Sequence, residues 1–447
     1  MSKVFYRQLR EHYPVVAGGR GCYLFDRAGK RYLDASGGAA VSCLGHNHPR
    51  VVEAIRRQVE TIAYAHTAFF TSDAAEELAE LLIRRAPPGM ARVYYTSGGS
   101  EAIEAALKMA RQYFVEKGEP ARTRFLARRQ SYHGNTLGAL AVGGNRWRRE
   151  AFAPLLGLQA THLTPCYPFR ERRPGEDDDA FLARLLAELE ETIQALGPET
   201  VIAFVAEPVV GATLGAVPAL PGYFQGVKAI LDRYGILLIL DEVMCGMGRT
   251  GTLYACEQEG VVPDLIAVAK GLGGGYQPIG AVVVHERVVE AFVEGSGVFQ
   301  HGHTYMGHPT ACAAALAVQR VIEEEDLLAR VRAMGERLQA GLEERFADHP
   351  HIADLRGRGL FRGFEIVRER THNTPFPPEL ALHARIKRAA MELGLICYPG
   401  HGTIDGRRGH HMLLAPPFII SEAEMEELLE LLASTFDRVF RELPDHG

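Results

Sequence analysis

A lysine stands at the end of an apolar run, and a glycine-rich turn follows it directly. The run is Leu265–Ala269, the lysine is Lys270, and the turn begins at Gly271. A lysine amine is seldom fully buried unless it is paired or functional. Burial lowers its pKa and makes it a nucleophile toward carbonyl carbons. Taken alone, this pattern is equally open to a lysine whose flexible chain reaches the surface at a strand end.

Two carboxylates continue a second apolar run. Asp241 and Glu242 follow Ile236–Leu240 directly. Because an unpaired carboxylate is costly to bury, one at a strand end is expected to face a site. Neighbouring residues of a strand point to opposite faces, so we expect only one of the two to face a given ligand, with Val243 on the side of Asp241. The alternative is an aspartate that caps a helix.

A glycine turn between a strand and a strong helix forms the third feature, Thr96–Ala102. Glycines here let backbone N–H groups approach an anion, and a helix N-terminus adds its positive dipole. Ser100 can cap the helix and also donate a hydroxyl hydrogen bond. The segment predicts a phosphate cradle, or else an ordinary turn with a serine cap. It is not a Walker A motif, because the Gly-Lys-Ser/Thr ending is absent.

The three features together are the groups that pyridoxal 5'-phosphate (PLP) requires. Its phosphate needs hydrogen-bond donors, its pyridine nitrogen an acidic partner, and its aldehyde an amine. The segment 96–102, Asp241 and Lys270 would supply them in that order. The sequence therefore predicts PLP as the cofactor.

The elements that must position these groups alternate between strands and helices. A helix is predicted from about Ser100 to Lys117, and strands at Val201–Ala206, Leu265–Ala269 and Ala281–Val284. Several of the predicted strands are continuous apolar runs, which is typical of strands buried on both faces of a parallel sheet. We expect an α/β domain with a mostly parallel sheet, which binds its ligand at the carboxyl ends of the strands.

The two ends of the chain have a different pattern, in which short strands mix with helices. Helices are predicted near 326–347, 378–393 and 421–441, with a strand at Leu360–Ile366 between them. We expect residues 56–324 to form the large domain and 325–447 a smaller α+β domain that the segment 1–55 joins.

Composition excludes several classes of function. The net charge of −6 and the pI of about 6.3 argue against nucleic-acid binding, which needs a basic surface. No window approaches about 18 apolar residues and no signal peptide is visible, so no membrane partner is expected. Seven cysteines without a Cys-x-x-Cys pair fit a reducing cytoplasm. The histidine groups show no clear metal-ligand pattern, and no metal is expected.

The sequence resembles the class III aminotransferases, which have the fold-type-I architecture of PLP enzymes, from about Gly21 to Phe418. The motifs that carry this resemblance occur in the family's order: Gly45-His46-Asn47-His48-Pro49, Thr96 to Ala102, Tyr132-His133-Gly134, Glu207-Pro208-Val209, Asp241 to Gly251, Lys270 and His303-Thr304-Tyr305.

The resemblance implies roles for the residues around the cofactor ring. Lys270 would form the Schiff base with PLP and then move the proton. Asp241 would pair with the pyridine nitrogen, while Val243 and the ring of Tyr132 would cover its two faces. Lys270, Asp241 and Tyr132 are thus the predicted catalytic residues.

The same resemblance implies further cofactor contacts. Gly99 and Ser100 would bind the phosphate, and His133 belongs to the same cofactor-binding set. Glu207 would support the site and can pair with an arginine. Thr304 looks like the threonine that reaches the phosphate of a neighbouring subunit, which implies a homodimer or homotetramer with shared active sites.

The carboxyl-terminal segment departs from related amine:pyruvate transaminases. Many of them carry a mobile arginine that grips a substrate carboxylate, and here its position falls on Gly406. Arg407 and Arg408 follow, and His410 replaces the expected aspartate. Either arginine can bind the carboxylate if the loop is shifted. The alternative is that both point to solvent.

The resemblance favours a ping-pong transaminase that takes nitrogen from a primary amine or ω-amino acid and passes it to pyruvate or another 2-oxo acid. Met244 supports the pyruvate branch, because ornithine- and 4-aminobutyrate-type enzymes usually have glutamine there. Racemases and an aminomutase of the same family are the second hypothesis. A cofactor-binding regulator is the third, but no basic segment for a DNA-binding domain is present.

Overall fold

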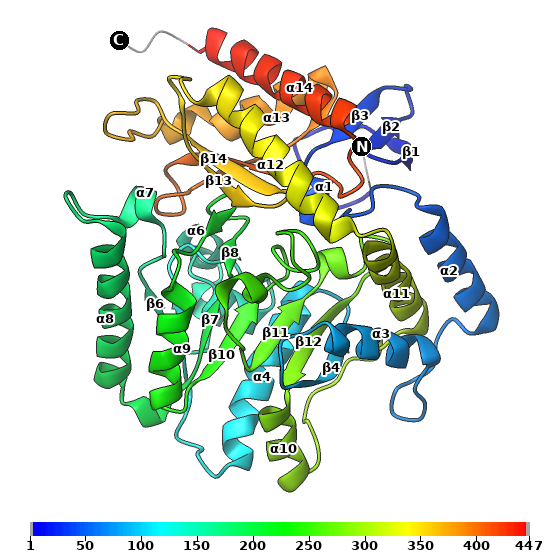
Figure 1. Ribbon diagram of the computed structural model, residues 1–447, viewed down its shortest axis with the longest axis vertical. Helices are drawn as coiled ribbons and strands as arrows, with labels where there is room; N and C mark the ends of the chain where they lie inside the picture. The colour runs from blue at the N-terminus through cyan, green and yellow to red at the C-terminus, as the bar shows by residue number, and fades with distance from the viewer. Residues whose placement is uncertain (1–2, 444–447) are drawn as a thin grey trace.

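The computed structural model describes residues 3–443, and its largest feature is a sheet of seven strands (Figure 1). In spatial order the strands are β4 (Met90–Thr96), β12 (Gly280–His285), β11 (Leu265–Val268), β10 (Leu237–Asp241), β7 (Val201–Ala206), β5 (Arg124–Arg128) and β6 (Ala160–Leu163). Neighbours pair in parallel, except that β12 is antiparallel to both β11 and β4. The predicted α/β domain with a mostly parallel sheet is confirmed.

The strand β12 shows what a continuous apolar run can predict. Its residues Ala281–Val284 are at most 3% exposed, because both faces of the sheet are covered. A strand buried on both faces is apolar throughout in either direction. The predicted strand is confirmed, and it is the antiparallel member of the mostly parallel sheet.

Alternate residues of the central strand β10 enter two separate cores. Leu237 and Ile239 pack in a core with α4, whereas Leu238 and Leu240 pack in a core with α3, α8, α9 and α11. This period of two is the pleat of a strand between two helix layers. The helices of these layers are α3 (Asp73–Arg84), α4 (Gly99–Glu116), α8 (Asp178–Leu196), α9 (Tyr223–Arg233), α10 (Glu286–Glu294) and α11 (Pro309–Glu324).

The two ends of the chain join in a second body above the large sheet (Figure 1). One sheet has the order β1 (Val16–Arg20), β2 (Tyr23–Asp26), β3 (Arg31–Asp34) and β15 (Leu395–Ile396), so that Leu33 pairs with Leu395. Another has the order β13 (Ile352–Arg358), β14 (Phe361–Ile366), β17 (His410–Leu414) and β16 (Tyr398–His401). The domain boundaries at 55/56 and 324/325 remain predictions.

Helices complete this second body and the connections to it. They are α1 (Gly37–Ala40), α2 (Pro49–Thr61), α12 (Leu327–Phe346), α13 (Leu382–Leu393) and α14 (Glu422–Arg441), while α5 (Leu137–Val142), α6 (Arg146–Glu150) and α7 (Pro168–Glu171) are short helices of the large body. The helix predicted from about residue 378 begins at Leu382, because a 3-10 turn and left-handed Ala381 precede it. Within residues 3–443, no helix combines the length and the apolar character that crossing a bilayer requires.

Candidate active site

Most of the predicted site residues follow strands that end at one edge of the central sheet. Asp241 is the last residue of β10, Glu207 follows β7, and Lys270 lies two residues after β11. The turn into α4 follows β4, and the segment 130–134 follows β5. Since these strands run the same way, the sheet brings the residues together at its carboxyl edge.

These segments enclose a cavity of about 480 Å³. Its walls come from residues 97–100, 132–134, 275 and 277–279, together with Arg7, Ala39, Val41, Arg148, Glu207, Ala212, Asp241, Val243, Met244, Ala269, Lys270 and Tyr398. Both bodies of the chain therefore contribute to the walls.

Lys270 lines the cavity from an unusual backbone conformation. Its φ is 47°, in the left-handed region that residues other than glycine rarely adopt. Such a conformation costs about 1–3 kcal/mol and is found at functional positions. Burial lowers the pKa of the amine to about 8, against the opposing charges of Asp241 and Glu207. A neutral, nucleophilic amine is therefore available near neutral pH.

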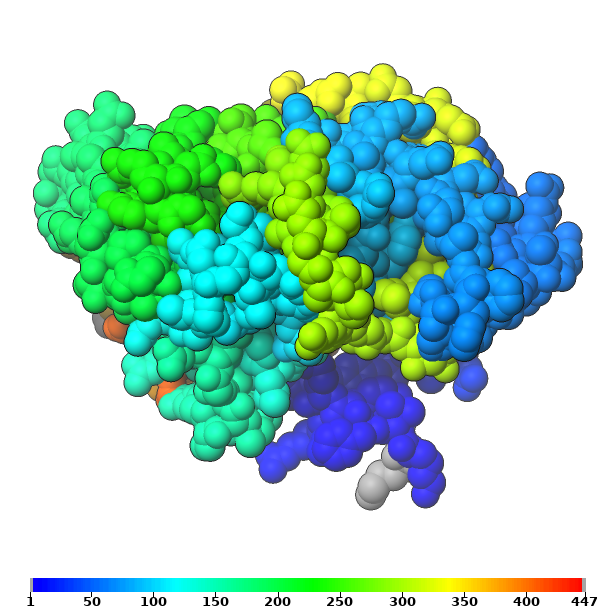
Figure 2. Space-filling view, turned by 90° about the horizontal axis from the view of Figure 1, so that it is seen from below, coloured from blue at the N-terminus to red at the C-terminus, as the bar shows by residue number. Residues whose placement is uncertain are grey.

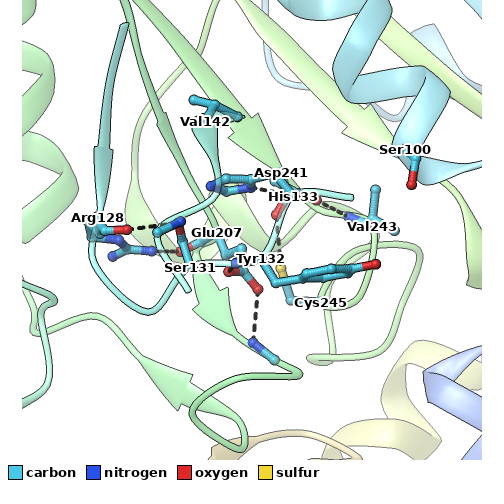
Figure 3. A network of polar contacts seen from close by, with 12 residues as sticks. Ser100, Arg128, Ser131, Tyr132, His133, Val142, Glu207, Asp241, Val243 and Cys245 are labelled. Carbon is cyan, nitrogen blue, oxygen red and sulfur yellow. Dashed lines mark hydrogen bonds and ion pairs between the residues drawn. The ribbon is translucent and has the colours of Figure 1, made fainter. Parts of the chain in front are cut away.

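Asp241 is held in place by two hydrogen bonds. Its Oδ2 lies 2.8 Å from Nδ1 of His133, and its Oδ1 accepts the backbone N–H of Val243 at 3.0 Å. His133 is buried, and its Nε2 has no partner among the described residues. Figure 3 shows this contact and the path of the segment that carries Tyr132. The two contacts, one to each oxygen, fix the orientation of the carboxylate at the cavity wall.

Glu242 points away from the cavity, as the alternation along a strand predicts. It is fully buried, and its carboxylate accepts the backbone N–H groups of Ala255 and Cys256. Burial raises its pKa to about 7. Asp241 and Glu242 are thus neighbours in the sequence with separate surroundings, one at the cavity and one in the core. Asp241 ends a strand and does not cap a helix.

Glu207 is buried at the cavity wall with its two oxygens in use. Oε1 accepts the backbone N–H of Tyr132 at 3.1 Å, and Oε2 accepts that of Gly211 at 3.0 Å. Burial raises its pKa, and the charge of Asp241 adds to this. The predicted arginine partner is not found among the described residues, because Arg128 donates to the main-chain oxygen of Glu207 and not to its carboxylate.

The glycine turn before α4 has a packing reason beyond the approach of an anion. A Cβ on Gly99 would lie 2.6 Å from Cγ1 of Val243, so only glycine lets the turn pack against that side chain. The expectation that Ser100 caps the helix was wrong. Gly98 occupies the N-cap, and Oγ of Ser100 accepts the backbone N–H of Asn135 at 3.0 Å. The first-turn N–H groups have no carbonyl within the helix to pair with.

Three predicted residues lie outside the cavity of this chain. Thr304 is exposed on the loop before α11, where its carbonyl accepts the hydroxyl of Tyr64. Arg407 pairs with Glu150 at 2.7 Å, and Arg408 pairs with Asp405 at 2.7 Å. Both arginine side chains are more than half exposed. The interpretation in which they point to solvent describes this structure.

Sequence reasoning missed two arginines and a tyrosine in the cavity wall. Arg148 comes from α6, Arg7 from the N-terminal segment, and Tyr398 from the start of β16. The guanidinium of Arg148 lies over the ring of Tyr132, 4.6 Å from its centroid. The sequence signals none of them, because Arg148 stands in the cationic run Arg146–Arg149 without an apolar strand before it.

Comparison with known proteins assigns the family. The sequence model of the protein family 'Aminotransferase class-III' matches residues 6–436. An uncharacterized aminotransferase of Schizosaccharomyces pombe is 43% identical over 99% of this chain and 96% of its own length. The chain belongs to the class III aminotransferases. It is therefore a PLP-dependent enzyme of fold type I, as the sequence predicted.

Solved structures agree with this family. An (S)-enantioselective omega-transaminase from Thermomicrobium roseum is 39% identical with a TM-score of 0.90, and the match covers 96% of this chain and 93% of that one. A PMP-bound aminotransferase from Vibrio fluvialis is 36% identical with a TM-score of 0.90, with 97% and 94% covered. The resemblance to class III aminotransferases and the PLP cofactor are thus confirmed.

The cavity of this class III aminotransferase fits PLP on its own evidence. Gly99 leaves no Cβ at the turn before α4, and the hydrogen-bonded carboxylate of Asp241 and the partly buried Lys270, whose pKa is lowered, line the same cavity. No group of three or more His, Cys, Asp or Glu among residues 3–443 is placed to hold a metal ion. The donors present match an organic cofactor with a phosphate, a basic nitrogen and a carbonyl.

Proposed function

We propose that this class III aminotransferase transfers an amino group from a primary amine or ω-amino acid to pyruvate by a ping-pong mechanism. The observation that supports it most is the convergence of Lys270, Asp241 and the first turn of α4 on one cavity. Met244 also lines the cavity, and it is an apolar residue where related 4-aminobutyrate-type enzymes usually carry glutamine.

We assign the cofactor contacts to the residues that line this cavity. Gly99 and Ser100 would bind the phosphate, and Asp241, oriented by His133, would pair with the ring nitrogen. Val243 and Tyr132 would cover the two ring faces, and Glu207 would fix the backbone of Tyr132. When bound, PLP supplies an electrophilic carbonyl and an electron-withdrawing ring.

Lys270 carries the chemistry that the chain itself performs. Its Nζ is the nucleophile that holds the cofactor. Once free as a neutral amine, Nζ can take the proton from the amine-bearing carbon of the donor. The lowered pKa of about 8 keeps a useful fraction of this amine neutral near pH 7. The opposing electrostatic effects of Asp241 and Glu207 limit how far burial lowers the pKa of Lys270.

We further propose a homodimer or homotetramer in which Thr304 reaches the phosphate site of a neighbouring subunit. Thr304 and Tyr305 are exposed, and Tyr305 and Tyr64 contact each other edge to face at 5.7 Å. Phe69 and Phe70 nearby in the chain are 79% and 69% exposed. Figure 2 shows the segments near residues 60–70 and 300 adjoining on one face. Exposed aromatic side chains at this density are typical of an interface.

A cytoplasmic location also belongs to this proposal. All seven cysteines are free, and six of them are buried. Free thiols persist in a reducing compartment, whereas extracellular chains commonly pair them.

The function is tested by giving the purified, PLP-loaded enzyme a panel of amines and ω-amino acids with pyruvate or 2-oxoglutarate. We expect alanine to form from pyruvate. Formation of glutamate alone would overturn the proposed acceptor. Continued turnover of a single amino acid without any oxo acid would indicate a racemase or aminomutase, because a transaminase stops after one half-reaction.

A further inference from the structure

An arginine without an acidic partner faces the substrate end of the cavity. Arg148 lines the cavity and is only partly exposed. Its side chain forms no ion pair with a carboxylate of residues 3–443, and its one described contact is the ring of Tyr132. A guanidinium suits the two oxygens of a carboxylate, which it can bind through parallel hydrogen bonds. Arg148 therefore has its charge available for a ligand.

The helix that carries Arg148 is fixed to the second body by a chain of hydrogen bonds. Asn145 caps α6 by accepting the backbone N–H of Arg148 at 3.2 Å, and its amide donates to Gln130. Gln130 in turn donates to the carbonyls of Gly402 and Thr403 at 2.6 and 3.0 Å. Asn145 and Gln130 are both buried. The guanidinium is therefore presented from an anchored helix.

The positive charge of Arg148 affects the pKa values of three nearby side chains. It opposes the burial that raises the pKa of Tyr132, and it adds to the lowering of the pKa of Lys270. It also lowers the pKa of His401. Arg148 is therefore close enough to act electrostatically on Lys270, Tyr132 and His401.

The same packing excludes an arginine from the position where related enzymes have one. Gly406 has a φ of 87°, and a Cβ there would lie 2.9 Å from the backbone nitrogen of Trp147 on α6. Any larger residue at 406 would push α6 away. The helix that blocks this position, α6, is also the helix that carries Arg148. The cationic side chain therefore comes from α6 and not from the loop at Gly406.

We propose that Arg148 binds the carboxylate of the substrate, so that the preferred donor is an ω-amino acid and not a carboxylate-free amine. The proposal rests on the transaminase function proposed above. Arg7 lines the same cavity but is exposed. It therefore adds positive electrostatic potential to the cavity and does not provide a fixed binding contact. Arg148 is the specificity residue.

The test compares two donors that differ in the carboxylate. Single half-reactions of the PLP-loaded enzyme with 4-aminobutyrate and with hexylamine are followed by the loss of the yellow cofactor absorbance. Arg148→Gln removes the charge and Arg148→Lys keeps it. Arg146→Gln is the matched control, because Arg146 is on the same helix, is exposed and does not line the cavity.

We expect Arg148→Gln to raise the apparent Kd for 4-aminobutyrate about 10- to 100-fold with little change in limiting rate, since a hydrogen-bonded charge is lost. Hexylamine should change less than about threefold, Arg148→Lys should recover part of the loss, and Arg146→Gln should match wild type. An equal loss with both donors, or no loss with 4-aminobutyrate, overturns the proposal.

Binding of pentanoate to the PLP-loaded enzyme, measured by calorimetry, separates this inference from the proposed function. Pentanoate carries the carboxylate without an amine, so it reports on Arg148 even if no donor reacts. We expect Arg148→Gln to weaken pentanoate about 10- to 100-fold. An unchanged Kd, or no binding to wild type, overturns the role of Arg148. Absence of any half-reaction in wild type instead overturns the proposed function.

Discussion

The two ends of the cavity are built in different ways. At the proposed cofactor end, Lys270, Asp241 and Glu207 follow strands of the central sheet, and both carboxylates have described hydrogen-bond partners. At the proposed substrate end, Arg148 comes from a helix of five residues and Arg7 from the N-terminal segment. Neither arginine forms an ion pair among the described residues.

This difference suggests that one end of the cavity serves the reaction and the other end serves the choice of substrate. The groups at the cofactor end must keep fixed positions for the reaction, and strand ends of a buried sheet provide them. The groups at the substrate end need only match one donor. Loops and short helices can change there without disturbing the sheet. The predictions below test whether the two ends can be altered independently.

The largest effect is expected at Lys270. Lys270→Ala should reduce the half-reaction with any amine by at least about 10⁴-fold, because it removes both the nucleophile and the proton carrier. Stopped-flow measurement of the cofactor absorbance checks this. Lys228→Ala is the control, since Lys228 pairs with Asp232 on the surface of α9. Borohydride labelling followed by peptide mapping should find the cofactor on Lys270, and a label on another lysine would show the assignment to be wrong.

Asp241 and its neighbour Glu242 offer a sharper form of the same comparison. Asp241→Asn keeps the shape but removes the charge, so we expect a loss of about 10²- to 10⁴-fold in kcat with little change in Tm. Glu242→Gln should do the opposite. It disturbs the hydrogen bonds to Ala255 and Cys256 and should cost about 1–3 kcal/mol of stability, with activity per folded molecule retained.

Calorimetric unfolding and steady-state kinetics of the two variants decide between these outcomes. If Glu242→Gln abolished turnover in protein that is fully folded and PLP-loaded, Glu242 would belong to the site. If Asp241→Asn kept wild-type kcat, the assigned ring-nitrogen contact would be wrong. Either result would contradict the assignment of Asp241 to the active site and of Glu242 to the protein core.

The pKa of Lys270 gives a pH dependence at the cofactor end. Burial lowers this pKa to about 8, so the neutral amine appears as pH rises through about 8. The rate at which the apoenzyme captures PLP should therefore rise about tenfold between pH 7 and pH 9 and then level off. Stopped-flow absorbance at several pH values measures it. A midpoint near that of an exposed lysine would show that Lys270 is not desolvated in the apoenzyme.

The sequence alone predicted the residues that line the proposed cofactor end of the cavity, because its signals there are local. Lys270 and Asp241 stand directly after apolar runs, and a buried strand that ends in a charged residue is conspicuous in one dimension. The sequence could not show the direction of β12, since a strand covered on both faces is apolar whichever way it runs. Nor could it place Ser100, because the N-cap depends on where the turn packs.

The substrate end could not be predicted for a related reason. Arg148 lies 16 positions after Tyr132 in the chain, and it meets that ring only because Asn145 and Gln130 tie α6 to the segment at Gly402. The sequence of this arginine-rich segment does not indicate which arginine side chain faces the cavity. Long-range contacts, and not residue type, decide it.

The smallest effect is expected for the two arginines that the sequence favoured. The double variant Arg407→Gln and Arg408→Gln should change the apparent Kd for 4-aminobutyrate less than about twofold, because exposed ion pairs contribute roughly 0–1 kcal/mol. Their partners Glu150 and Asp405 lie on the outer side of the contact between α6 and the loop. The same half-reaction assay that tests Arg148 applies here. A loss comparable to that of Arg148→Gln would mean that the loop rearranges when substrate binds. The carboxylate site would then be formed by movement of a loop, in contrast to the fixed groups at the ends of the strands.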